Sequence, residues 1–160
     1  MVKGNSKKES IDKVSEYFQY FRDTCGYSIC GVSQINRDLS NPIYQKLDTF
    51  EPNIDNIKES GRPAEDADCV ISLFDPVRYN TDDGSYGDVS RFRCNTSGAK
   101  FFRSTKILKN TYGEDDIRIG MAFHGATGTF KELPKPKYVN ENWTDKDFNN
   151  IISGNYFLDI

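Results

Sequence analysis

The sequence predicts an α/β fold in which central parallel strands are flanked by helices and followed by a C-terminal antiparallel hairpin. Three observations predict this fold. A helical apolar pattern is followed by two apolar runs, at residues 27–32 and 69–74, and runs without strict alternation are typical of parallel strands buried on both faces. A period-2 pattern late in the chain then indicates a half-buried strand. We assign the globular part to residues 1–133, with 1–8 flexible, and a tail to 134–160.

The first predicted element is an amphipathic helix over residues 7–24. Ser6 and Glu9 have the spacing of a capping box, in which each side chain accepts a hydrogen bond from the other residue's backbone N–H. Gly26 follows the pattern and is suited to end the helix, because glycine readily adopts the left-handed conformation. The apolar positions recur at three- and four-residue spacing: Ile11, Val14, Phe18 and Phe21.

The middle of the chain is predicted to alternate between strands and short helices. The run at 27–32 is the first central strand, and residues 38–53 form a loop with two Xaa-Pro steps. Residues 54–60 form a short helix that ends at a glycine, and Pro63 can open one further helical turn. Residues 69–74 form the second central strand.

The last third is predicted to be antiparallel. Residues 75–100 are rich in Gly, Asp, Ser and Asn, which indicates a long exposed excursion. Residues 101–109 form a strand, and a turn that contains Gly113 leads to residues 117–123, where apolar positions alternate with others. Residues 128–133 form a short edge strand before the Pro134-Xaa-Pro136 break.

Composition indicates a soluble globular protein and little more. The 160 residues carry 36% hydrophobic and 28% charged residues and a formal net charge of −3. This charge gives no electrostatic footprint for nucleic acid and does not exclude one. The longest apolar runs are far shorter than the ~20 residues that span a bilayer. We expect a cytoplasmic protein that has no contact with a membrane.

Isolated reactive side chains predict neither a metal site nor a nucleophilic one. The four cysteines form no Cys-Xaa-Xaa-Cys pair, and we interpret Cys30 and Cys69 as small buried hydrophobic residues inside strands. His124 is the only histidine, and its place beside a turn indicates an exposed polar residue. A group of acids could suggest a metal cluster, an interpretation that we do not favour: Glu59, Glu65, Asp66 and Asp68.

Three motifs occur in a characteristic order. Gly31-Val32-Ser33-Gln34-Ile35-Asn36-Arg37 follows the first apolar run, Glu59-Ser60-Gly61 follows the loop, and Lys106-Ile107-Leu108-Lys109-Asn110-Thr111-Tyr112-Gly113 ends the later strand. Together they resemble the second half of the motor domain of DnaB-like replicative DNA helicases, particularly those of phages. The resemblance covers residues 10–133 and implies a partial RecA-like P-loop NTPase domain.

The resemblance implies roles in nucleotide binding and catalysis for residues on two strands. Gln34 matches the glutamine that senses the terminal phosphate. The slot of the arginine that acts across the subunit interface falls on Thr111 by the phage-type match and on Lys109 by the bacterial-type match. Neither is an arginine, and lysine lacks the planar fork of a guanidinium. The implied nucleotide-binding residues are Gln34, Lys106 and Lys109, although Lys109 could equally be a solvated lysine at a strand end.

The loop that the resemblance assigns to DNA gives a second set of candidates. In the family this loop holds a single strand with lysines and backbone N–H groups. Here it also carries Asp38, Asp48 and Glu51, so an ordinary surface loop is an equal interpretation. The candidate DNA-binding residues are Arg37, Lys46 and Lys58.

A phosphate loop of the Gly-Xaa4-Gly-Lys-Ser/Thr type is absent from the sequence. Because that loop holds the nucleotide phosphates, we expect no ATP hydrolysis by the chain alone, and no cofactor or metal. ATP and Mg²⁺ would bind only in an assembly with the helicase N-terminal half or other helicase subunits. The resemblance further implies a hexameric ring, single-stranded DNA as a partner and, for a phage protein, the cytoplasm of a bacterial host.

Two other functions remain open at this point. The chain could be a catalytically inactive helicase-like protein that regulates or loads a true helicase. It could also be a single-stranded nucleic-acid binding module without any motor role.

Overall fold

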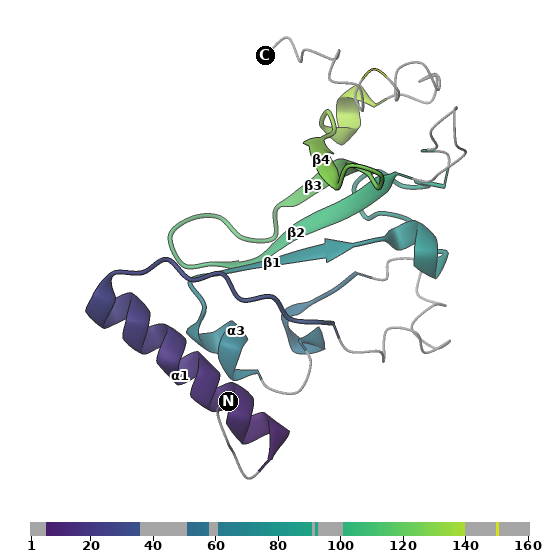
Figure 1. The fold of residues 1–160 in the computed structure, drawn as a ribbon. Coiled ribbons are helices and arrows are strands. Elements are labelled where there is room, and N and C mark those ends of the chain that lie inside the picture. Colours follow the sequence, from purple (N-terminus) through teal and green to yellow (C-terminus); the bar gives the residue numbers. More distant parts are fainter. Residues whose placement is uncertain are drawn as a thin grey trace.

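The computed structural model describes residues 6–35, 51–57, 61–90, 92, 101–139 and 150. Its centre is one four-stranded sheet in the order β1-β2-β3-β4, and all three pairings are antiparallel. Helices α1 and α3 lie together below β1 in the view of Figure 1. The elements are α1 (Lys7–Cys25), α3 (Arg62–Asp66), β1 (Cys69–Phe74), β2 (Phe102–Asn110), β3 (Arg118–His124) and β4 (Thr129–Glu132).

The predicted fold class is therefore wrong. A RecA-like domain requires central parallel strands, whereas the described part of this chain holds a single antiparallel sheet and two α-helices. The strand at Cys69–Phe74 was correctly located, but it lies at the edge of the sheet and pairs with β2. Its residues alternate between exposed and more buried positions, as expected for a strand with one covered face.

The first predicted central strand is also not formed. Residues 27–34 are exposed and adopt no strand conformation, and Val32 is 97% exposed. The nearest sheet-like contact is an isolated antiparallel bridge between Ile35 and Ile57. The physical reason is that an apolar run becomes a strand only when a neighbouring strand satisfies its backbone N–H and C=O groups. Cys30, in this segment, and Cys69, at the start of β1, are both exposed, and their predicted burial is wrong.

Helix α1 follows its local signals closely. The Ser6 hydroxyl accepts from the Glu9 N–H at 3.2 Å, and the Ser6 N–H donates to the Glu9 carboxylate at 3.0 Å. Gly26 ends the helix in the left-handed conformation with φ of 68°. The predicted capping box and helix end are both confirmed.

The short elements between α1 and the hairpin agree with the prediction in part. A 3-10 helix, η2, covers Ile54–Asn56, whereas residues 58–60 of the predicted short helix lie outside the described residues. Pro63 lies in the first turn of α3, as predicted. A second 3-10 helix, η3 (Pro76–Tyr79), begins the predicted excursion and is capped by Asp75, whose side chain accepts from the Arg78 N–H at 3.2 Å.

The hydrophobic core covers one end of one sheet face. Phe102 on β2 and Ala122 on β3 are cross-strand partners and are almost fully buried. Phe92 packs on Phe102 with a ring-centroid distance of 5.2 Å. The core is completed by residues from the excursion and from the segment around β4: Val77, Val89, Phe101, Leu133 and Val139, with Tyr86 at its margin.

The predicted C-terminal hairpin is confirmed. β3 and β4 pair through Met121–Glu132 to His124–Thr129, and Gly128 in the turn has φ of 66°.

Candidate functional site

Gln34, the predicted phosphate sensor, is exposed in the extended segment that follows α1. The next residue, Ile35, forms the bridge to Ile57 and packs beside Phe74. The segment therefore reaches the sheet near β1, but Gln34 does not sit at the end of a buried strand as predicted. The three candidate DNA-binding residues lie outside the described residues: Arg37, Lys46 and Lys58.

Lys109 has a structural contact instead of an open position. Its ammonium donates to the Ala64 carbonyl at 3.2 Å and to the Glu65 carbonyl at 2.6 Å. These carbonyls belong to α3, where a cation satisfies acceptors that the short helix leaves unpaired. Thr111, the alternative candidate for the arginine slot, is exposed, and its backbone N–H donates to the Asp68 carbonyl at 2.8 Å.

Helix α1 is attached to the rest of the chain through polar contacts. Ser15 is a buried residue of α1, and its hydroxyl donates to the Asp66 carboxylate at 2.7 Å. Arg22 donates to the Asp66 carbonyl at 3.2 Å and lies 3.3 Å from the Asp68 carboxylate. We call these contacts, together with an ion pair of 3.1 Å between Arg62 and Glu16, the polar seam.

The polar seam explains the acids that could have indicated a metal. Asp66 and Asp68 bind side chains of α1, and Asp66 also pairs with Arg62 at 3.4 Å. Within the described ranges no three His, Cys, Asp or Glu side chains are grouped so that they could hold a metal ion.

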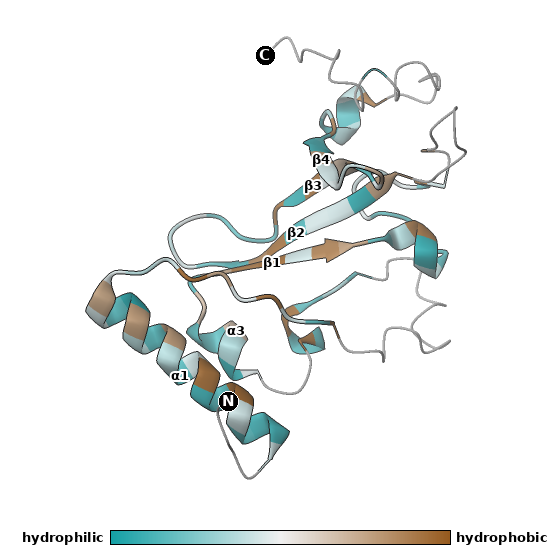
Figure 2. Cartoon of the chain, viewed as in Figure 1, coloured by the Kyte–Doolittle hydropathy of each residue, from teal (hydrophilic) through white to brown (hydrophobic). Residues whose placement is uncertain are grey.

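Another side of α1 carries an apolar stripe that is partly exposed. Phe18 of this stripe also lies beside Gly31, where an added Cβ would be 3.4 Å from its ring. Val14, Phe18 and Phe21 recur at helical spacing, and both phenylalanines are 41% exposed. Figure 2 shows hydrophobic residues along the helix. The Phe21 ring stacks on Tyr27 with centroids 6.3 Å apart, which extends the surface beyond the helix end. We call Val14, Phe18, Phe21 and Tyr27 the aromatic face. An amphipathic helix normally buries such a face, so its exposure is unusual.

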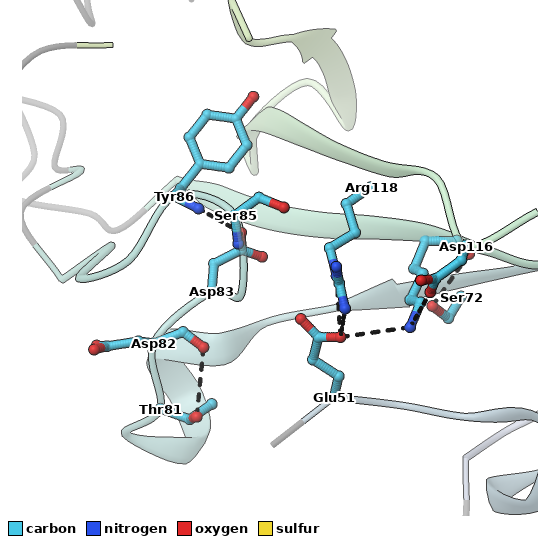
Figure 3. A network of polar contacts seen from close by, with 10 residues as sticks. Glu51, Ser72, Thr81, Asp82, Asp83, Ser85, Tyr86, Asp116 and Arg118 are labelled. Atoms are coloured by element: carbon cyan, nitrogen blue, oxygen red, sulfur yellow. Dashed lines mark hydrogen bonds and ion pairs between the residues drawn. The ribbon is translucent and has the colours of Figure 1, made fainter. Parts of the chain in front are cut away.

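A second group of polar side chains lies on the sheet (Figure 3). Lys106 on β2 and Arg118 on β3 are cross-strand partners. The Glu51 carboxylate receives the Arg118 Nε and Nη2 groups at 3.1 and 2.6 Å, and Lys106 Nζ lies 3.5 Å away. Lys106 Nζ is also 2.6 Å from Asp116. We call Glu51, Lys106, Asp116 and Arg118 the charge cluster.

The charge cluster shifts the titration of two of its members. Hydrogen bonding to Glu51 raises the pKa of Arg118, and the hydrogen bond from Lys106 lowers the pKa of Asp116. Lys106 was predicted from the family resemblance as a nucleotide-binding residue, yet here it is paired with two carboxylates. Sequence reasoning did not connect it with Glu51 or Arg118. The signal that could have indicated the cluster was the negative charge of Glu51 in the predicted loop, which is opposite to the charges of Lys106 and Arg118.

Single polar residues elsewhere support the fold. His124 Nδ1 lies 2.8 Å from the Thr127 hydroxyl, which lies 2.8 Å from the Thr129 hydroxyl, and these contacts tie the β3–β4 turn. The described residues include no helix that is both long and apolar enough to cross a membrane.

The described geometry therefore brings Lys106 together with two carboxylates, those of Glu51 and Asp116. It does not assemble a set of catalytic side chains. In comparisons with known proteins, no family model and no curated protein matches this sequence.

Proposed function

We propose that this chain is the C-terminal portion of a DnaB-like replicative DNA helicase and that it acts only with a second polypeptide that supplies the phosphate loop. The motif order from Gly31 to Gly113 supports the family. The observation that indicates a partner is the partly exposed aromatic face of α1. Phe18 and Phe21 remain 41% exposed, so part of the aromatic face is available to another polypeptide.

The aromatic face offers apolar surface for a contact. Burying a large apolar side chain completely contributes about 1.5–3 kcal/mol, and covering the remaining 41% of Phe18 and of Phe21 contributes a part of that. The occupant that we propose is the phosphate-loop polypeptide, through an apolar surface of its own. In the joint assembly that polypeptide would hold ATP and Mg²⁺, and the exposed Gln34 would sense the terminal phosphate.

A specific observation favours the catalytically inactive alternative as the second candidate. Both lysines assigned to nucleotide are engaged within this chain, Lys106 with Glu51 and Asp116 and Lys109 with α3 carbonyls. A chain that keeps these contacts in the assembly would regulate or load a helicase without contributing to ATP turnover. In either case Arg37, Lys46 and Lys58 remain the candidates for contact with single-stranded DNA.

Complementation tests the proposal. The purified chain is mixed with the phosphate-loop half of a DnaB-like motor domain, and co-elution on size exclusion is followed by titration with a fluorescent ATP analogue and Mg²⁺. We expect a complex that binds nucleotide, whereas the chain alone neither binds nor hydrolyses it. The double variant Phe18→Ser/Phe21→Ser should abolish co-elution. Tyr112→Ser is the matched control, because Tyr112 is 83% exposed and lies outside the aromatic face.

The outcomes separate the two candidates. A complex that binds and hydrolyses ATP, with hydrolysis reduced by Gln34→Ala, supports the helicase proposal. If the chain forms a complex with a complete helicase and Gln34→Ala does not change ATP hydrolysis by that complex, the regulatory role is favoured. The absence of any complex, or hydrolysis by the chain alone, contradicts the proposal.

A further inference from the structure

The outer side of β1 lacks the protection that edge strands usually carry. β1 is the first strand in the sheet order, and residues 27–34 form no strand beside it. Its six residues include neither a charged side chain nor a proline. The irregularity in its pairing places one extra residue, Leu108, on β2 and not on β1. Because charges, prolines and bulges are the usual means of blocking an edge strand, β1 is open to pairing with another strand.

The backbone of Ile71 faces this outer side. Its cross-strand partner is Ile107 on β2. The Ile107 N–H donates to the Ile117 carbonyl, and the Ile107 carbonyl accepts from the Asp116 N–H, both at 2.9 Å. In an antiparallel sheet a residue directs both backbone groups to the same neighbour, and Ile107 directs them towards the β3 side. The N–H and C=O groups of Ile71 therefore point away from β2.

Alternate residues of β1 share this orientation. The Asp68 carbonyl accepts from the Thr111 N–H, so Asp68 faces β2, as the alternation requires. By the same alternation the outward backbone groups belong to Cys69, Ile71 and Leu73. The side chains of these three residues are exposed as well, Ile71 by 61% and Leu73 by 51%. One row of residues thus offers both hydrogen-bonding groups and apolar side chains to a partner.

The other edge of the sheet has a different chemistry. β4 is four residues long and carries Lys131 and Glu132, and short charged strands resist edge pairing. A contact between β1 of one copy and β4 of the next would build an open chain of molecules, whereas a contact between two β1 strands is symmetric and closes after two copies. The two edges of the described sheet therefore favour a pair of β1 strands.

We propose that β1 is a self-association surface whose occupant is β1 of a second copy. The two strands run antiparallel about a two-fold axis at Ile71, so Cys69 of each copy lies opposite Leu73 of the other. In this register the outward N–H and C=O groups of both strands satisfy one another. The exposed side chains form one apolar stripe across the axis, and no like charges meet there.

This dimer goes beyond the proposed function, because it needs no phosphate-loop polypeptide and does not use the aromatic face. In this mode of recognition main-chain hydrogen bonds supply the affinity and alternate side chains supply the specificity. A single strand from each copy makes a small interface, and small interfaces are typical of weak, transient complexes. We therefore expect a dimer that forms reversibly as the concentration rises.

Sedimentation equilibrium of the full chain over a range of concentrations tests the dimer. The average mass should rise from that of one chain to that of two. Ile71→Lys places a charge at the axis and should weaken the association by at least about tenfold. Tyr138→Lys is the matched control and should associate as the wild type does. Tyr138 is 60% exposed and lies in the 3-10 helix η4 (Pro136–Tyr138), outside β1.

Amide hydrogen exchange locates the contact in the wild type. The amides of Ile71 and Leu73 should become protected as the concentration rises, because their N–H groups then donate to the second copy. The Ser72 amide faces β2 and should be protected at every concentration. If Ile71→Lys does not fold, as judged by circular dichroism, this exchange pattern decides the outcome.

Three results would overturn the inference. The first is an average mass that stays at one chain at millimolar concentration. The second is an association that leaves the exchange of the Ile71 and Leu73 amides unchanged. The third is an association that folded Ile71→Lys retains in full; if Phe18→Ser/Phe21→Ser abolishes that association, the copies meet through the aromatic face and not through β1.

Discussion

Tyr86 lies flat against the backbone of Gly120 on β3. A Cβ at Gly120 would lie 2.6 Å from two ring atoms of Tyr86 and 2.9 Å from its hydroxyl oxygen. The ring also packs edge-on against Phe102 at 5.3 Å, and its hydroxyl donates to the Pro134 carbonyl at 2.7 Å. Gly120 is thus the position at which the excursion after β1 meets the sheet.

Gly120→Ala is expected to destabilise the fold by about 1–3 kcal/mol, because overpacking must displace a ring that is held at both ends. Urea unfolding measures the effect. Gly125→Ala is the matched control, since its added Cβ would meet Phe123 at an ordinary 3.7 Å. Equal stability of the two variants would contradict the close contact between Tyr86 and Gly120.

The Tyr86 hydroxyl predicts a loss of stability in alkali. Burial raises the pKa of Tyr86 to about 12 from an ordinary value of 10.0. Below pH 10 the phenol is protonated in both states, so it adds no pH dependence. Between pH 10 and 12 the unfolded chain binds fewer protons than the folded one, so the free energy of unfolding falls as the pH rises. Because Tyr86 is only partly buried, the loss from this group is about 1–2 kcal/mol.

Tyr86→Phe tests this assignment. The variant should lose about 1 kcal/mol at neutral pH with its hydrogen bond and should then show a shallower decline above pH 10. Tyr112→Phe, at an exposed tyrosine, should leave the alkaline profile of the wild type unchanged. Identical alkaline slopes for wild type and Tyr86→Phe would refute the role of Tyr86.

Lys109→Met is expected to reduce stability by about 1–2 kcal/mol, because the α3 carbonyls lose their charged donor. The family resemblance alone predicts a different result, namely lower ATP turnover without a change in stability. Lys135→Met is the control at an exposed lysine. Thermal unfolding followed by circular dichroism separates the two variants, and an unchanged transition for Lys109→Met would show that the contact with α3 adds nothing.

Thr111→Arg tests the arginine slot in the complemented helicase assembly. If Thr111 occupies that slot, a guanidinium there should raise DNA-stimulated hydrolysis by at least about tenfold, a small part of the ~10³–10⁵ that an arginine finger can supply. Tyr112→Arg adds the same charge one residue later and should not do so. Equal hydrolysis by both variants would place the slot elsewhere, with Arg103 and Arg118 as the next positions to test.

Local signals in the sequence were sufficient for some elements and insufficient for others. Ser6 and Glu9 specify the start of α1 and Gly26 specifies its end, so the helix was predictable. The alternation before and after Gly120 likewise located β3. By contrast, the position of β1 in the sheet is set by its pairing with β2, in which Cys69 lies opposite Asn110. These residues are far apart in the sequence, so no local pattern predicts the pairing. An apolar run such as 69–74 looks the same at the centre or at the edge of a sheet.

The candidate sites show the same limit. Gln34 was selected from a motif, but its surroundings depend on a strand that the described chain does not form. The charge cluster was missed because Glu51 and Arg118 are 67 residues apart, and the sequence shows only isolated charges at both positions. The aromatic face was visible as helical spacing, but the sequence did not show which side of α1 contacts the chain, which follows from the hydrogen bonds of Ser15 and Arg22.

The polar seam and the aromatic face give α1 two contacts with opposite responses to salt. Ion pairs such as Arg22–Asp68 and Arg62–Glu16 are exposed enough to be screened, whereas salts such as sulfate strengthen apolar association. Rising sulfate is therefore expected to weaken the exposed ion pairs of the polar seam while it strengthens apolar contacts of the aromatic face.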